Sequence, residues 1–126
     1  MAPPADVHRS LVEVFGAGIE RVEVIEHSWR ARLHGRAAAT TRPGRIYLRG
    51  SARAFFADPG LVLHEYFHVL HQWEPGLLTV GRYLLEWFRR GYWDNRFEIE
   101  AREFVEDHLH RFRALLSRGG PGRPSH

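Results

Sequence analysis

The most constraining feature of this chain is an apolar segment, residues 61–73, that also carries three histidines and a glutamate. Its sequence, LVLHEYFHVLHQW, places apolar side chains around most of a helix, so we expect this helix to be buried. Imidazole and carboxylate groups in a buried helix need partners, because removing them from water is costly. Any fold that buries this segment must therefore supply such partners.

The segment contains the motif His64-Glu65-Tyr66-Phe67-His68, an HExxH pattern. Residues four apart share one face of a helix, so His64 and His68 can direct an imidazole nitrogen at the same ion. Glu65 lies about 100° further round the helix and flanks that position. Two nitrogen ligands beside a carboxylate that can accept a proton from water are typical of zinc hydrolases. A metal-free amphipathic helix is the alternative, and the expected burial favours the metal.

Composition restricts the classes of protein that remain. A length of 126 residues and an apolar fraction of 44% predict one globular domain. The absence of cysteine excludes disulfides and cysteine-ligated zinc. No apolar run approaches membrane-spanning length, and the N-terminus has no signal-peptide pattern. We therefore expect a protein that is cytoplasmic as synthesised, which another system could deliver elsewhere.

The basic residues do not form the pattern of a nucleic-acid binder. All eighteen are arginine, the net charge is only +3, and the arginines are scattered among glutamates. Nucleic-acid-binding domains more often show a clustered basic face. We expect neither a nucleic acid nor a membrane as partner.

The N-terminal half predicts a helix followed by strands. Residues 1–5 are expected to be disordered, and Asp6 to cap a helix that ends near Gly16. Alternating apolar and polar residues predict strands at 21–24, 29–33, 36–41 and 45–49, the last two joined by a turn at Arg42-Pro43-Gly44. Residues 51–57 form a connector of no assigned structure.

The C-terminal half predicts helices. Asp58 followed by Pro59 is a helix start, and Pro75-Gly76 ends the HExxH helix after about Trp73. Further helices are expected at 78–90 and from Arg96 to Ser117, with residues 118–126 disordered. A helix, a small twisted sheet and then helices indicate an α+β fold in a single domain, residues 1–126.

A zinc hydrolase usually has three protein ligands and one open position, so a third ligand must be found. His71 lies about 10.5 Å along the helix from His64, too far for both to bind one ion easily. In the last helix, Glu98 falls within the apolar stripe, whereas Glu100 falls outside it. We therefore prefer Glu98 as third ligand, with Glu100 as runner-up, then His71 and His108. Asn95-x-x-Glu98 also fits a capping box, in which Glu98 would only close the helix start.

Taken in order, these motifs resemble a known family. HEYFHVLHQW at 64–73, followed by ExxA at 98–101, resembles gluzincin-type zinc metallopeptidases. The chain is more similar to short zincin-like domains of unknown function, some encoded near bacterial contractile injection systems. These carry Ala-x-Thr and Ile-Tyr in a hairpin before HExxH, as at 37–41 and 46–47, and NxxExEA after it, as at 95–101. The resemblance covers roughly residues 30–105.

The resemblance implies a minimal zincin-like fold in which His64, His68 and Glu98 bind Zn²⁺ and Glu65 is the catalytic base. Two positions depart from the family pattern. The glutamine often found three residues after the second histidine is His71 here, followed by Gln72, and the aspartate of the ExxxD pattern is Arg102. The candidates to orient the histidines are then Asp94, Glu86 and Glu100.

The expected function is a zinc metallopeptidase acting on a peptide or protein. Zinc would polarise the scissile carbonyl, and Glu65 would move the water proton to the leaving amine. Strand Ile46–Arg49, if it is the sheet edge, could pair with the substrate. Tyr92 is the candidate oxyanion donor, with Tyr83 and His108 as alternatives. The competing hypotheses are a catalytically weak or inactive zincin-like binding or assembly module, and a metal-free helical domain.

Overall fold

The computed structural model describes residues 2–29, 38–76, 82, 85, 89 and 96–119. It begins with helix α1 (Ala5–Phe15), which is followed by the 3-10 helix η1 (Ala17–Arg21). Pro4, not Asp6, occupies the cap position of α1. The prediction that Asp6 caps this helix, and the predicted disorder at Ala5, are therefore wrong. An acidic residue in the first turn is still favourable there, because it faces the positive end of the helix dipole.

Three short strands form a mixed sheet: β1 (Glu23–Ile25), β2 (Ala39–Arg42) and β3 (Arg45–Leu48). The strand order is β1-β3-β2, with β1 parallel and β2 antiparallel to β3. The predicted turn between the last two strands is confirmed, and Gly44 provides its left-handed residue, with φ 71°. Substrate pairing by Ile46–Arg49 required that strand to be the sheet edge, and this condition is not met, because β3 is paired on both sides. The two edge strands of the described sheet are β1 and β2.

One further sequence prediction needs correction, and a segment that was left unassigned contains a helix. Trp29 has helical backbone and is 66% exposed, so the strand expected at 29–33 is wrong at its first residue. The rest of that strand lies outside the described residues. The connector at 51–57 contains helix α3 (Ala52–Phe56), which starts where the Ser51 hydroxyl accepts a hydrogen bond from the Ala54 N–H at 3.1 Å. A helix of only five residues leaves little periodicity in the sequence.

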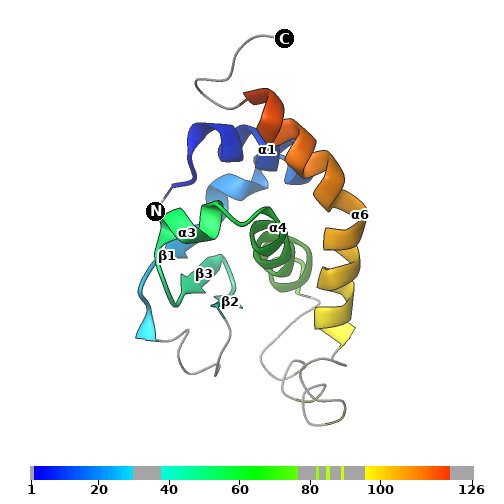
Figure 1. Ribbon diagram of the computed structural model, residues 1–126. Helices are drawn as coiled ribbons and strands as arrows, with labels where there is room; N and C mark the ends of the chain where they lie inside the picture. Colours follow the sequence, from blue (N-terminus) through cyan, green and yellow to red (C-terminus); the bar gives the residue numbers. More distant parts are fainter. Residues whose placement is uncertain are drawn as a thin grey trace.

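Helix α4 (Pro59–Phe67) carries the HExxH motif and lies between the sheet and the C-terminal helix (Figure 1). Its predicted start is confirmed, because the Asp58 carboxylate accepts a hydrogen bond from the Leu61 N–H at 3.2 Å. The helix then continues as a π-helix, η2 (His68–Trp73), in which the Glu74 N–H bonds to the Val69 carbonyl at 2.9 Å. This wider turn was not expected from the sequence.

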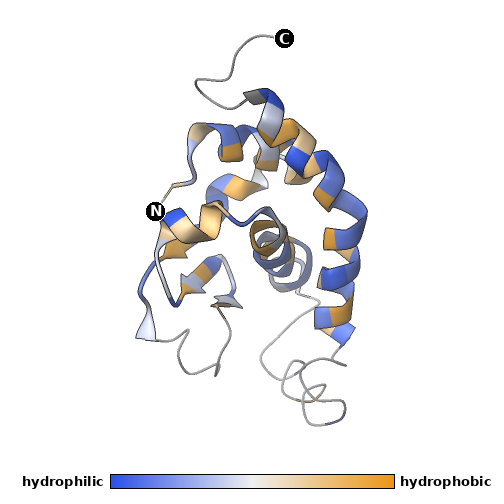
Figure 2. Cartoon of the chain, in the orientation of Figure 1, coloured by the Kyte–Doolittle hydropathy of each residue, from blue (hydrophilic) through white to orange (hydrophobic). Residues whose placement is uncertain are grey.

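Helix α6 (Arg96–Gly119) runs along one side of the molecule and packs against both α4 and α1 (Figure 1). Hydrophobic and hydrophilic residues alternate along it, as expected for a helix with one buried face (Figure 2). Predicted disorder from residue 118 is wrong for Arg118 and Gly119, which are helical. The helix predicted at 78–90 lies mostly outside the described residues, but Arg82, Leu85 and Arg89 are helical.

The core is built from residues of α1, α3, α4, α6 and the sheet, and the fold is α+β as predicted. Its fully buried members include Leu11, Ile46, Val62, Leu63 and Phe112. Among the described helices, none is both long enough and apolar enough to cross a membrane.

Candidate metal centre

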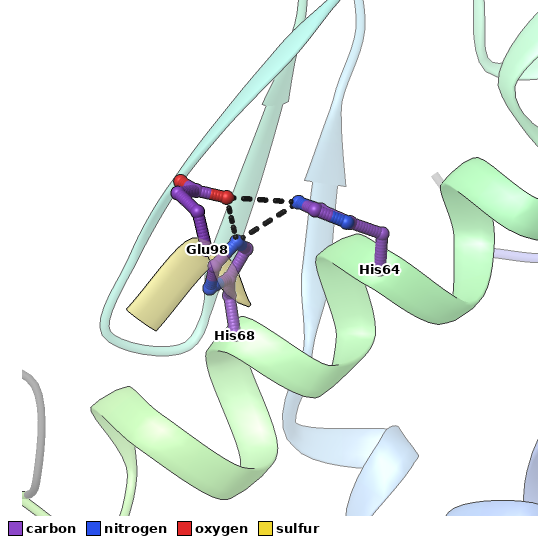
Figure 3. A group of neighbouring side chains, drawn as sticks. All are labelled: His64, His68 and Glu98. Carbon is purple, nitrogen blue, oxygen red and sulfur yellow. Dashed lines mark hydrogen bonds and ion pairs between the residues drawn. The ribbon is translucent and has the colours of Figure 1, made fainter. Parts of the chain in front are cut away.

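Helix α4, its continuation η2 and helix α6 bring His64, His68 and Glu98 together (Figure 3). The Glu98 Oε1 atom lies 3.0 Å from the Nε2 atom of His64 and 2.9 Å from that of His68. The two Nε2 atoms are 3.1 Å apart. Three potential ligand atoms, contributed by segments about thirty residues apart in the chain, therefore converge on one point.

The orientation of α6 distinguishes the two glutamates proposed as third ligand. Glu98 is 4% exposed and points at the histidines, whereas Glu100 is exposed on another face of the helix. The helical phase predicted for Glu98 is confirmed, and Glu100 is not part of this cluster. Asn95, which the capping-box alternative requires, lies outside the described residues.

The donor set fits a small divalent cation. In a tetrahedral zinc site, ligand atoms at about 2.0–2.2 Å from the ion lie roughly 3.3–3.5 Å from one another. The separations here are 2.9 to 3.1 Å, so small outward movements would admit an ion. Without a cation, both rings can donate to Glu98 only if both Nε2 atoms carry protons. These two protons would face each other and repel, because the Nε2 atoms are 3.1 Å apart. A cation between the three ligand atoms would remove this repulsion.

The electrostatics of the cluster also favour positive charge. Burial acts to lower the pKa of His68, but its hydrogen bond to Glu98 and the charges of Glu98 and Glu65 raise that pKa to about 9. Burial acts to raise the pKa of Glu98, but hydrogen bonds from His64 and His68 hold it well below its usual range. The carboxylate thus stays ionised, and it attracts either a proton on His68 or a metal ion.

Glu65, the predicted base, is buried, with 6% of its surface exposed, and it lines the same cleft as His64 and Glu98. Burial raises the pKa of its carboxyl group, the two histidines lower it, and Glu98 raises it, with a net upward shift. A raised pKa makes a carboxylate a stronger base, and such shifts are typical of catalytic acids and bases. The position and the electrostatics of Glu65 both suit proton transfer.

Gln72 is the residue that the sequence analysis did not assign to the site. Its side chain is buried between η2 and α6, with Oε1 at 2.6 Å from the His68 Nδ1 and Nε2 at 2.9 Å from the Phe97 carbonyl. A buried amide within an apolar helix is the sequence signal that could have identified it. Of the residues proposed to orient the histidines, Glu100 points away, and Asp94 and Glu86 lie outside the described residues.

His71 and His108 are not part of the cluster. The His71 ring packs against Phe15, Phe67 and Phe104 at centroid distances of 5.1 to 5.5 Å, and the His108 ring stacks on Phe104 at 4.0 Å. This aromatic contact lies on the side of α4 that faces α1 and α6. Neither residue is therefore the third ligand. Tyr92 and Tyr83, proposed as oxyanion donors, lie outside the described residues.

A cleft of about 510 Å³ opens beside the cluster. One wall comes from β2 and the residue before it, another from the start of α4, and a third from α6. Arg102, which stands where the ExxxD pattern would place aspartate, lies on the third wall, one helical turn from Glu98. The lining residues are Ala38, Ala39, Asp58, Gly60, Leu61, His64, Glu65, Glu98, Arg102, Val105 and Glu106.

Comparison with known proteins gives no further assignment. No protein-family model, curated protein or solved structure matches this chain.

Proposed function

We propose that this protein is a zinc-dependent metallopeptidase of the zincin type. The observation that carries the proposal is the convergence of His64, His68 and Glu98 beside a buried Glu65, at the wall of an open cleft. Two imidazole nitrogens and one carboxylate oxygen form the ligand set of many catalytic zinc sites. When bound there, zinc supplies a Lewis acid that polarises a carbonyl group and acidifies water.

Glu65 is the proton carrier in this proposal. Its carboxylate takes a proton from a water molecule in the cleft as the water oxygen bonds to the scissile carbonyl carbon. Glu65 then gives that proton to the nitrogen of the departing amine, and the C–N bond breaks. The raised pKa of its carboxyl group supports both steps, because the group must accept and release a proton near neutral pH.

The edge of β2 is the proposed support for the substrate backbone, in place of the strand first expected. The Arg49 N–H donates to the Ala38 carbonyl at 2.9 Å, so the backbone groups of Ala38 face β3. Because these directions alternate along an antiparallel strand, the N–H and C=O of Ala39 face the opposite side. Both residues line the cleft, so an extended peptide could pair with Ala39 beside the metal.

The test is cleavage of a mixed peptide library by zinc-loaded protein, with Glu65→Gln as the matched variant. Glutamine keeps the size and burial of the side chain but cannot serve as a base. We expect the variant to retain fold and zinc while losing activity by about two orders of magnitude or more. Equal cleavage by both proteins would exclude Glu65 as the base. A wild-type chain that binds zinc but cleaves no peptide would favour the inactive binding-module alternative.

A further inference from the structure

The Gln72 side chain connects the second histidine of the motif to the backbone of α6. It is 1% exposed, and both ends of its amide have partners: His68 Nδ1 at 2.6 Å and the Phe97 carbonyl at 2.9 Å. A backbone carbonyl can only accept a hydrogen bond, so the amide NH₂ must face Phe97. The amide oxygen then faces His68, where it can only accept.

This arrangement determines which nitrogen of His68 carries a proton. Since the amide oxygen accepts, Nδ1 must be the protonated nitrogen of the neutral ring, and Nε2 keeps its lone pair. The Nε2 atom is the one that faces Glu98 and His64. We propose that Gln72 is a positioning residue that holds His68 in the Nδ1–H tautomer and so presents Nε2 to the metal. This inference rests on the proposed metal centre.

The spacing of the two residues explains how Gln72 reaches His68. Gln72 follows His68 by four positions in the sequence, so the two side chains lie on the same side of the helix, one turn apart. His71, the residue before Gln72, packs instead against Phe15 and Phe104. Gln72 lies within the π-helix η2, and local π-helical turns often occur at functional sites.

Gln72 also couples the two helices that carry the ligands. The carbonyl group of Phe97 accepts the hydrogen bond from the Gln72 amide, and Phe97 immediately precedes Glu98 in the first turn of α6. One amide therefore fixes the ring of His68 and the backbone beside Glu98 at the same time. Its loss would loosen two of the three ligands, and loss of such outer contacts typically lowers metal affinity 10- to 100-fold.

The experiment measures zinc affinity by competition with a chelator for wild type and Gln72→Met, an apolar replacement of similar length. We expect affinity to fall by about 10- to 100-fold. Gln72→Glu keeps an oxygen that accepts from His68 but has no N–H for Phe97, so we expect it to bind zinc more tightly than the methionine variant. A zinc affinity of Gln72→Met within twofold of wild type would overturn the proposal. An equal loss of zinc affinity in both variants would also overturn it.

A matched control separates positioning from general stability. Thr41→Val removes the hydrogen bond that Trp73 Nε1 donates to Thr41 Oγ1 at 3.0 Å, which also anchors η2 but touches no ligand. It should lower the unfolding temperature without changing zinc affinity by more than about twofold. A loss of affinity matching that of Gln72→Met would show that the effect is structural, contrary to the proposal.

The tautomer itself is read by long-range ¹H–¹⁵N NMR of the histidine rings. We expect zinc on Nε2 and a proton on Nδ1 of His68, and zinc on Nδ1 would contradict the proposal. If the wild-type chain binds no zinc, the proposed function is wrong, but the role of Gln72 can still be tested. The test is then which nitrogen of the neutral His68 ring carries the proton in the metal-free protein at alkaline pH. A proton on Nδ1 in wild type that is lost in Gln72→Met supports it, and a proton on Nε2 in both refutes it.

Discussion

His68 shows how one side chain adjusts to its surroundings in a buried polar cluster. Its ring lies between a carboxylate at Nε2 and an amide oxygen at Nδ1, so in the absence of metal the doubly protonated ring satisfies both contacts. The groups that face it are Glu98, Glu65, His64 and Gln72. Metal and proton therefore compete for the same nitrogen, and zinc binding must be linked to pH.

This linkage predicts a pH dependence of the metal-free protein. The pKa of His68 is raised from 6.5 to about 9 in the folded state. The raised pKa of His68 thus contributes at most about 3 kcal/mol to the free energy of unfolding. This contribution is complete below about pH 6.5 and is lost as the pH rises through 9. Urea unfolding of chelator-treated protein across this range measures the loss. Calorimetry at pH 7.5 in two buffers should show proton release on zinc binding, and the absence of both effects would contradict a raised pKa.

At the scale of the element, the phase of α6 decides which glutamate joins the site. Phe97 and Ala101, which are buried, share the inner side of the helix with Glu98, and Glu100 points to solvent. The apolar stripe of α6 could be predicted from the sequence, because an α-helix repeats every 3.6 residues whatever packs against it.

Two glutamate variants test this phase. Glu98→Gln removes the charged ligand atom, so we expect zinc affinity to fall by at least about 100-fold, since neutral amides are poor zinc ligands. Glu100→Gln, the same change two residues on, should leave affinity unchanged. Titration against a coloured chelator measures both variants. Zinc loss in the Glu100 variant alone would mean that the helix is rotated relative to the structure described above.

For the whole molecule, the proposed metal centre would join segments that are far apart in the sequence. His64 and His68 belong to α4 and its continuation, whereas Glu98 belongs to α6, which also packs against α1. An ion bound by all three would therefore oppose separation of α6 from the rest of the core.

We accordingly expect the purified protein to contain about one zinc ion per chain and to be stabilised by it. Free zinc at a hundred times the dissociation constant adds about 2.7 kcal/mol to the free energy of unfolding. For a domain of this size, that corresponds to a rise of roughly 10 °C in the unfolding midpoint. Elemental analysis and thermal unfolding with zinc or chelator measure the two quantities. Zinc content near zero after supplementation, with no change in midpoint, would exclude the metal centre.

The features that could be predicted from the sequence are those that depend on neighbouring residues. The Asp58 cap, the shared face of His64 and His68 and the inward direction of Glu98 were all predicted correctly. Each depends on helix geometry within one or two turns, and so on residue types at fixed short spacings.

The tertiary structure alone decided which segments meet. It placed β3 at the centre of the described sheet, through pairing with both β1 and β2, and so left β1 and β2 as the edge strands. It also brought Gln72 to Phe97, 25 residues further along the chain, and gave η2 its π-helical turn. Such contacts depend on how distant surfaces pack, and a local pattern in the sequence carries no information about which distant surface will be its partner.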